Sequence, residues 1–205
     1  MKEKIVRPGK VSVLYGSCGS GKSLSAMKIA SEFKGKVKVL DPEGCWSYGG
    51  KLQRFGLNPS IVLSNIFPKE VQDISKMADL AEYPEKYNSP EKFTEFMQTL
   101  PKDTDLLVID YLSLMCGVHK FGSARYLSVL TKYAETTGTA VLVTEQVPRK
   151  SAYIIPSTEI FQYLLTKESS DEGALCLSVK EYTGDGELLP YTEIAINFEG
   201  LCKQA

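Results

Sequence analysis

Gly16-Ser17-Cys18-Gly19-Ser20-Gly21-Lys22-Ser23 has the form G-x-x-x-x-G-K-[ST] and follows the apolar run Val11-Ser12-Val13-Leu14-Tyr15. The run predicts a buried strand, so the motif has the strand–loop–helix setting of a phosphate-binding P-loop rather than that of a chance Gly/Ser-rich turn. Glycines let such a loop wrap a phosphate, with its N–H groups at the positive end of the following helix. We therefore expect the loop to bind ATP, with Lys22 reaching the β- and γ-phosphates and the Ser23 hydroxyl completing the shell of a Mg²⁺ ion.

Length and charge limit the kind of protein that carries this loop. The chain has 205 residues, 43% hydrophobic and 24% charged, with a net charge of −1. This length suits one α/β domain, and we expect residues 1–205 to form a single ATPase domain. The small net charge gives no global attraction to polyanions, so any nucleic-acid site must be a local patch.

Cysteine and histidine usage argues against a zinc centre. There are five cysteines, never spaced as C-x-x-C, and one histidine, His119. This pattern favours a reduced, cytoplasmic setting. No apolar leader opens the sequence and no apolar run is long enough to span a bilayer, so no membrane association is expected.

Carboxylates follow two further apolar runs. Lys36-Val37-Lys38-Val39-Leu40-Asp41 predicts a strand ending in Asp41-Pro42-Glu43-Gly44, and Asp105-Leu106-Leu107-Val108-Ile109-Asp110 has the Walker B pattern. Open α/β sheets bind ligands at the carboxyl ends of their strands. Glu43 is therefore a candidate catalytic base, and Asp110 a candidate metal-shell carboxylate.

The apolar run Ala140-Val141-Leu142-Val143-Thr144-Glu145-Gln146 predicts another buried strand with polar residues at its tip. Gln146 is placed either to sense the γ-phosphate or simply to cap a loop. The segment 147–156 then carries Arg149, Lys150 and Tyr153 without period, and it is predicted to be a loop.

The remaining segments complete an α/β pattern. We expect helices after the P-loop as far as Gly35, near residues 71–80, at Phe93 to Leu100 and at Gly122 to Gly138, with a break from Pro84 to Pro90. Further strands are expected at Ser60 to Ser64, Ile160 to Leu165, Ala174 to Glu181 and Tyr191 to Phe198, with Ser169 to Gly173 as a break. The predicted fold is a twisted, mostly parallel sheet flanked by helices, which ends as an antiparallel meander.

Trp46 and Tyr48 are aromatic residues that we expect either to pack against the protein or to stack on a purine base.

On the P-loop, the Asp41-x-Glu43-Gly44 strand end, the strand ending in Asp110 and the helix–strand run Arg125 to Val147, the chain resembles the RecA/RadA superfamily of ATPases, and within it the small archaeal RadB branch. The resemblance covers nearly the whole chain. It implies a RecA-like core, with Glu43 as the base that activates water, Asp110 supporting Mg²⁺ and Gln146 opening a second DNA-binding loop.

By the same resemblance, single-stranded DNA is the expected nucleic-acid partner in recombination or repair. A recombinase or repair protein and a second copy of the chain are the candidate protein partners. The residues expected to contact DNA are Arg149, Lys150, Tyr153, Lys120 and Arg125.

The chain departs from the superfamily pattern at two positions of the site. Tyr111 stands after the Walker B aspartate, where Ser is usual, and Glu145 stands before Gln146, where Asn is usual. Glu145 is expected to bring negative charge near the γ-phosphate, and both changes predict slow hydrolysis. Only ten residues precede the first strand, so the N-terminal domain and the polymerisation linker of the superfamily are not expected, and Phe121-Gly122-Ser123-Ala124 matches that linker's motif by coincidence. An accessory or mediator role is thus favoured over strand exchange by a filament.

Two other functions stay open. A small-molecule or nucleotide kinase is disfavoured because the chain has four arginines without a cluster, whereas kinases enclose the transferred phosphoryl group with several cations. A nucleotide-gated module that binds a protein partner without significant catalysis is compatible with every motif.

Overall fold

One sheet organises the part of the chain that the computed structural model describes, which is residues 5–41, 46, 89–116, 123–147, 159–171, 174–183 and 187–197. The sheet has seven strands in the order β2-β3-β4-β1-β5-β6-β7. The strands are β1 (Val11–Gly16), β2 (Val37–Leu40), β3 (Leu106–Ile109), β4 (Ala140–Gln146), β5 (Ile160–Asp171), β6 (Ala174–Tyr182) and β7 (Leu188–Asn197).

The sheet is parallel from β2 to β5 and antiparallel from β5 to β7, which confirms the predicted fold class. The expected break at Ser169 to Gly173 was wrong in part, because β5 continues to Asp171 and pairs Asp171 with Ala174 of β6. A shift of register between Lys167 and Ser169 accommodates this polar extension. The predicted strand at residues 60–64 and helix at residues 71–80 lie outside the described residues.

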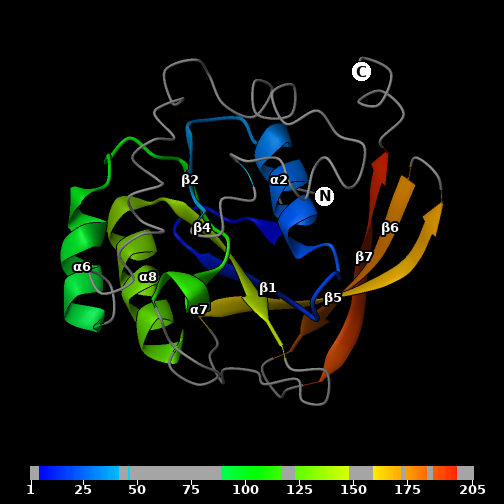
Figure 1. Cartoon of the computed structure of the whole chain (residues 1–205). Helices are drawn as coiled ribbons and strands as arrows, with labels where there is room; N and C mark the ends of the chain where they lie inside the picture. The colour runs from blue at the N-terminus through cyan, green and yellow to red at the C-terminus, as the bar shows by residue number, and fades with distance from the viewer. Residues whose placement is uncertain are drawn as a thin grey trace.

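Helices cover both faces of the sheet (Figure 1). Helix α2 (Lys22–Glu32) lies on one face, and α6 (Pro90–Thr99), α7 (Leu112–Met115) and α8 (Ser123–Thr137) pack on the other. None of the helices in the described ranges has the length and hydropathy to cross a membrane.

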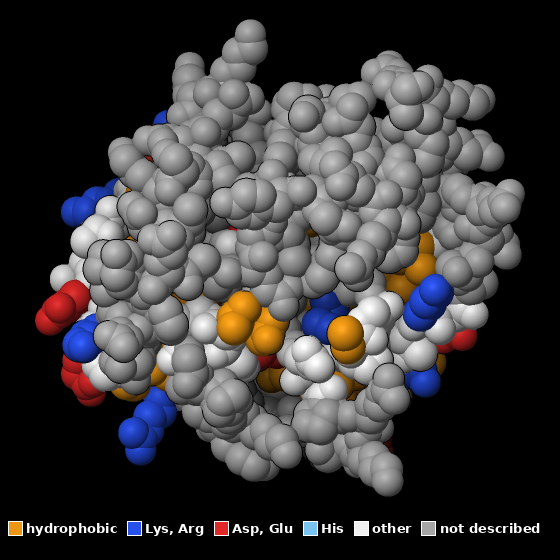
Figure 2. Space-filling view, viewed as in Figure 1, with side chains coloured by type: hydrophobic (Ala, Val, Ile, Leu, Met, Phe, Trp, Pro, Cys, Tyr) orange, Lys and Arg blue, Asp and Glu red, His pale blue; other side chains and the backbone are white. Residues whose placement is uncertain are grey.

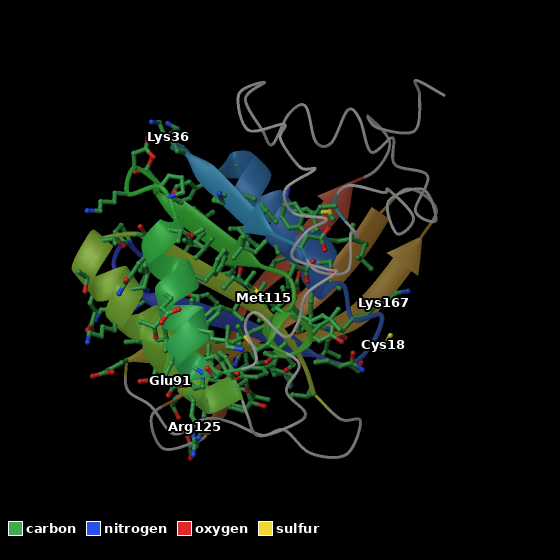
Figure 3. The ribbon with its side chains drawn as sticks, turned by 60° about the vertical axis from the view of Figure 1, so that its left-hand side comes forward. Cys18, Lys36, Glu91, Met115, Arg125 and Lys167 are labelled. Carbon is green, nitrogen blue, oxygen red and sulfur yellow. The ribbon has the colours of Figure 1, made fainter. Side chains whose placement is uncertain are left out.

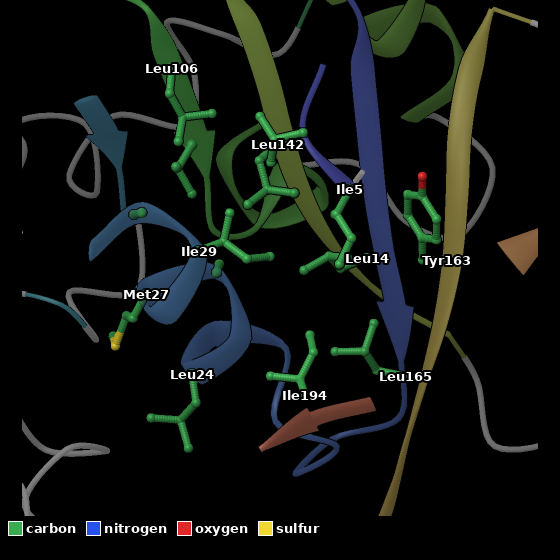
Figure 4. Packing of buried hydrophobic residues seen from close by; sticks show 14 of the residues in the cluster. Ile5, Leu14, Leu24, Met27, Ile29, Leu106, Leu142, Tyr163, Leu165 and Ile194 are labelled. Carbon is green, nitrogen blue, oxygen red and sulfur yellow. The ribbon is translucent and has the colours of Figure 1, made fainter. Parts of the chain in front are cut away.

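Alternation along the central strands supplies a core for each face. On β4, Ala140 and Leu142 face α2, whereas Val141 and Val143 face the α6–α8 layer. Figure 4 shows the first of these cores, in which Leu24, Met27 and Ile29 of α2 meet side chains from β1, β3, β4, β5 and β7. Burial of each such side chain contributes about 1.5–3 kcal/mol, so the sheet edge that carries the site is held on a rigid base.

Helix α6 shows why the predicted break ends where it does. Pro90 is its first residue, and the Ser89 side chain accepts a hydrogen bond from the Lys92 backbone N–H at 3.2 Å. Proline suits the first helical position because the missing N–H would be unpaired there anyway. Phe93 and Met97, four residues apart, then bury the inner face of the helix.

Candidate nucleotide and metal site

The P-loop connects the end of β1 to the start of α2, as the sequence predicts. Gly21 is the N-cap residue of α2 with φ 84°, a conformation that favours glycine. A Cβ atom on Gly21 would also lie 2.7 Å from Leu177 Cδ1, so the loop fits closely against the antiparallel strands. At the other end of the loop, a Cβ on Gly16 would collide with the buried Ser20 hydroxyl.

Lys22 lies folded over its own loop. Its ammonium donates hydrogen bonds to the carbonyl oxygens of Gly16 at 3.0 Å and Ser17 at 2.9 Å. These two carbonyls stand at the start of the loop, whereas Lys22 stands at its end. The ammonium of Lys22 therefore links the end of the loop to its start.

Ser23 and Asp110 are brought together although 87 residues separate them. Ser23 Oγ donates to Asp110 Oδ1 at 3.2 Å, and Thr144 Oγ1 donates to the same oxygen at 2.5 Å. The other carboxylate oxygen, Oδ2, accepts from the indole Nε1–H of Trp46 at 2.8 Å. Asp110 is only 3% exposed, and each oxygen of its buried carboxylate accepts at least one hydrogen bond.

Strand β4 lies between the strand of the P-loop and the strand of Asp110, so its tip borders both. Gln146 is paired in register with Gly16, and the Val147 backbone N–H donates to the Gly16 carbonyl at 3.1 Å. The side chain of Gln146 is exposed. Gln146 thus stands directly beside the first residue of the P-loop.

Glu43 lies outside the described residues, but both flanks of its segment are described. Asp41, at 4% exposure, follows β2, and the backbone N–H of Trp46 donates to Asp41 Oδ2 at 2.5 Å. Strand β2, which precedes Glu43, pairs with β3 and borders neither the P-loop strand β1 nor its neighbour β4. Trp46 and Tyr48 were expected either to pack in the core or to stack on a purine. The indole of Trp46 is buried and hydrogen-bonded, which favours packing for this residue. Tyr48 lies outside the described residues.

Arg125 is the one member of the expected DNA-contacting set within the described residues; Lys120, Arg149, Lys150 and Tyr153 lie outside them. It is exposed in the first turn of α8, near Glu91 of α6 (Figure 3), and its charge contributes to lowering the pKa of Glu91, after the hydrogen bonds that Glu91 accepts. At the left-hand edge of the face shown in Figure 2, positive and negative side chains of the described residues are interspersed. The DNA surface therefore stays a prediction.

Glu145 points to the opposite face of β4 from Thr144 and is buried against α7. Ser113 Oγ lies 2.6 Å from Glu145 Oε1 and 2.7 Å from Oε2, and the Glu145 side chain is 3% exposed. Burial raises the pKa of this carboxyl, and the hydrogen bonds from Ser113 and the charge of Lys22 oppose that rise. The expectation that Glu145 brings negative charge near the γ-phosphate stays a prediction, and the side chain itself is buried against Ser113 of α7.

Replacement of Glu145 by Gln should raise the melting temperature at neutral pH. A carboxyl whose pKa is raised in the folded state stabilises the fold below its ordinary pKa of about 4.3, and that stability is lost as the pH rises through the folded value. Gln resembles the protonated form, so the gain should be present at pH 7 and absent near pH 4. For a domain of this size each kcal/mol gained corresponds to about 2–4 °C.

Thermal unfolding of both proteins from pH 4 to pH 8 measures this effect. Lys22, Ser113 and the buried thiol of Cys116 are the neighbouring groups, and the pKa of Cys116 is itself raised by burial and by Glu145. A variant that is less stable than the wild-type protein at pH 7 would show that the ionised carboxylate stabilises the fold.

Thr144, Trp46 and Ser113 are parts of the site that sequence reasoning did not assign. The alternation of β4 places Thr144 on the face of Leu142, which is a usable signal for a polar side chain beside the P-loop helix. No local signal links Trp46 to Asp110 or Ser113 to Glu145, because each pair joins distant segments. Tyr111, noted as a departure, is the half-buried N-cap residue of α7.

Solved structures with this fold include two that cover most of the chain. The RadB recombinase has a TM-score of 0.51 and 20% identity, over 93% of this chain and 96% of that one. The flagellar accessory protein FlaH from Methanocaldococcus jannaschii has a TM-score of 0.54 and 15% identity, over 96% and 90%. No family model matches the sequence. No curated protein matches it either. With the P-loop, the Ser23–Asp110 pair and the strand order in place, the chain has the fold of the RecA-like P-loop ATPases.

Proposed function

We propose that this protein is a Mg²⁺-dependent ATPase that turns over slowly and acts with single-stranded DNA in an accessory or mediator role. The observation that carries the enzymatic part is the hydrogen bond of 3.2 Å between Ser23 Oγ and Asp110 Oδ1, beside a P-loop whose lysine bonds to the carbonyls of Gly16 and Ser17. The DNA part depends on the resemblance to recombinases and on the composition of the loop after Gln146.

The residues at the site suit ATP and Mg²⁺. Mg²⁺ prefers oxygen ligands, uses few protein groups and is completed by phosphates and water. Ser23 Oγ and Asp110 Oδ1 are such oxygens, and the described residues hold no cluster of three His, Cys, Asp or Glu side chains that would favour another metal. ATP would lie along Gly16 to Ser23, and the bound Mg²⁺ would neutralise charge on its β- and γ-phosphates.

Three residues of this chain are assigned roles in hydrolysis. Lys22 holds the terminal phosphates, and Glu43 accepts a proton from the attacking water as general base. Gln146, next to Gly16, contacts the γ-phosphate and transmits its presence to the loop that follows. Hydrolysis is expected to be slow because Tyr111 and Glu145 stand where the superfamily that the chain resembles usually has Ser and Asn.

Single-stranded DNA would bind along the loop from Gln146 to Pro156, with Lys120 and Arg125 from the neighbouring segment. Cations that follow the backbone, combined with an aromatic ring, are the means of sequence-tolerant single-strand binding. The two similar structures have different printed roles, a recombinase and a flagellar accessory protein, so the fold by itself leaves the DNA function open. ATP would order this surface through Gln146.

Loss of Arg149 and Lys150 together should flatten the dependence of DNA affinity on salt. Each lost phosphate contact lowers the slope of log K against log[salt] by roughly 0.7 for a single strand. Tyr153→Ala should weaken binding by about 1–3 kcal/mol for one stacked base with little change in slope. Fluorescence anisotropy of a labelled oligonucleotide, with an ATP analogue or ADP, measures both. Equal affinity in all variants at low salt would remove this loop from the proposal.

A nucleotide-gated module that binds a protein partner is the second candidate function. The departures from the superfamily pattern at Tyr111 and Glu145 favour it, since slow catalysis is compatible with nucleotide binding. The two described arginines disfavour a kinase, because neither lies at the P-loop. The Cζ atom of Arg7 lies 3.7 Å from the centre of the Phe161 ring, near the start of β1, and Arg125 lies near Glu91.

One assay separates these functions. ATP turnover is measured with and without single-stranded DNA and is compared with phosphate transfer to nucleoside monophosphates. Turnover stimulated by DNA supports the proposal, nucleotide binding without turnover supports the module, and transfer to a monophosphate supports the kinase.

As parts of the same proposal, residues 1–205 form one cytoplasmic domain, and a repair protein or a second copy of the chain is the protein partner.

A further inference from the structure

The only tryptophan of the chain, Trp46, joins two carboxylates of the site. Its backbone N–H donates to Asp41 Oδ2 at 2.5 Å, and its indole Nε1–H donates to Asp110 Oδ2 at 2.8 Å. The side chain is 2% exposed and belongs to the core beneath α2. Any buried indole N–H needs a hydrogen-bond acceptor, and a backbone carbonyl would be enough if Trp46 served packing alone. Here the acceptor is the carboxylate of Asp110, at the end of the Walker B strand.

The indole helps to fix the plane of the Asp110 carboxylate. Oδ1 accepts from Ser23 and Thr144, and Oδ2 accepts from Trp46. With donors on both oxygens, rotation of the carboxylate about its terminal bond would break hydrogen bonds in a buried place, which is costly. The carboxylate is therefore held with one oxygen toward Ser23 of the P-loop and the other toward the indole.

We propose that Trp46 is a positioning residue for the metal–nucleotide site: it orients the Asp110 carboxylate and ties it to the segment that carries Glu43. The inference depends on the proposed ATP and Mg²⁺ site, which it deepens. Asp41 and Trp46 bracket residues 42–45 in the sequence, and a hydrogen bond joins these two bracketing residues. The Asp110 backbone N–H also donates to the Leu40 carbonyl at 2.9 Å, so the strand before this segment is joined to Asp110 as well.

Trp46→Phe keeps an aromatic ring but removes the indole N–H. Hydrogen-bond partners of metal-binding side chains typically contribute 10–100-fold to metal affinity. We therefore expect the Mg²⁺ concentration for half-maximal binding of a non-hydrolysable ATP analogue to rise about 10–100-fold. Affinity for the analogue in EDTA should be unchanged, because Trp46 contacts the metal-shell carboxylate and the P-loop carries the phosphate contacts.

Two further variants separate the explanations. Phe93→Leu reduces a buried ring on the opposite face of the sheet and controls for general loss of stability, so its Mg²⁺ dependence should equal that of the wild-type protein. Asp110→Asn should lose most of the Mg²⁺-dependent gain in affinity. If the wild-type protein shows no such gain, the ATP and Mg²⁺ proposal is wrong. If the wild-type protein and Asp110→Asn behave as expected but Trp46→Phe matches the wild-type protein, only the role of Trp46 is wrong.

A second measurement needs no change at Trp46. Because the chain has one tryptophan, its ¹H–¹⁵N spectrum contains one indole N–H signal. Addition of Mg²⁺ with the ATP analogue should shift this signal in the wild-type protein, and the analogue in EDTA should shift it less. A signal that does not respond to Mg²⁺, in protein that binds Mg²⁺ with the analogue, would overturn the inference even if Trp46→Phe fails to fold.

Discussion

Glu43→Gln is expected to slow ATP hydrolysis at least about a hundredfold while leaving ATP binding intact, because a general base positioned on water contributes about 10²–10⁴-fold. Gln has nearly the shape of Glu but cannot accept the proton. The segment that carries Glu43 begins at the buried Asp41 and ends at Trp46, whose indole contacts Asp110. Trp46 thus links Asp41, on the other side of the segment, to Asp110, the proposed metal-shell carboxylate.

Single-turnover hydrolysis at saturating ATP measures the effect, and thermal shift by ATP checks that binding is retained. Glu135→Gln is a suitable control, because it removes an exposed carboxylate that pairs with Lys10 at 3.7 Å, far from the P-loop. Its turnover should equal that of the wild-type protein. Full turnover in Glu43→Gln would leave Glu43 as part of an acidic turn and move the base elsewhere.

Features with a local signal were the ones that the sequence predicted well. The strand before the P-loop and the strand before Asp110 are short apolar runs bounded by polar residues, and both form buried parallel strands. Helices α2 and α8 follow their apolar period and end close to Gly35 and Gly138. Helix α7, with only four residues, is too short to show a period and was not predicted.

Pairing across the sheet could not be predicted in the same way. The order β2-β3-β4-β1 is a property of tertiary packing, and no local pattern indicates that β4 lies between the P-loop strand and the strand of Asp110. The contacts that fix Asp110 likewise join residues 34, 64 and 87 positions away. Motifs were enough to predict roles for Ser23, Asp110 and Gln146. Thr144 and Trp46, which donate hydrogen bonds to Asp110, could be identified only from the three-dimensional structure.

Lys22→Ala should weaken ATP binding about tenfold to a hundredfold. A hydrogen bond to a charged group is worth about 1.5–3 kcal/mol, and 1.4 kcal/mol corresponds to a factor of ten. The wild-type ammonium already lies over the loop, bonded to the carbonyls of Gly16 and Ser17. A methyl group at this position offers neither the charge nor these contacts.

Calorimetric titration measures the affinity of the variant for ATP, ADP and AMP. A loss of Lys22 should affect these three affinities differently, whereas unfolding should lower all of them. Lys22 is expected to reach the β- and γ-phosphates, so affinity for ATP and ADP should fall while affinity for AMP, which lacks both, stays nearly constant. Lys28→Ala removes an equal charge from the same helix, where Lys28 pairs with Glu32 at 2.8 Å, and should bind all three nucleotides as the wild-type protein does. An equal loss for AMP and ATP would point to a collapsed loop, and an unchanged ATP affinity would remove Lys22 from the phosphate site.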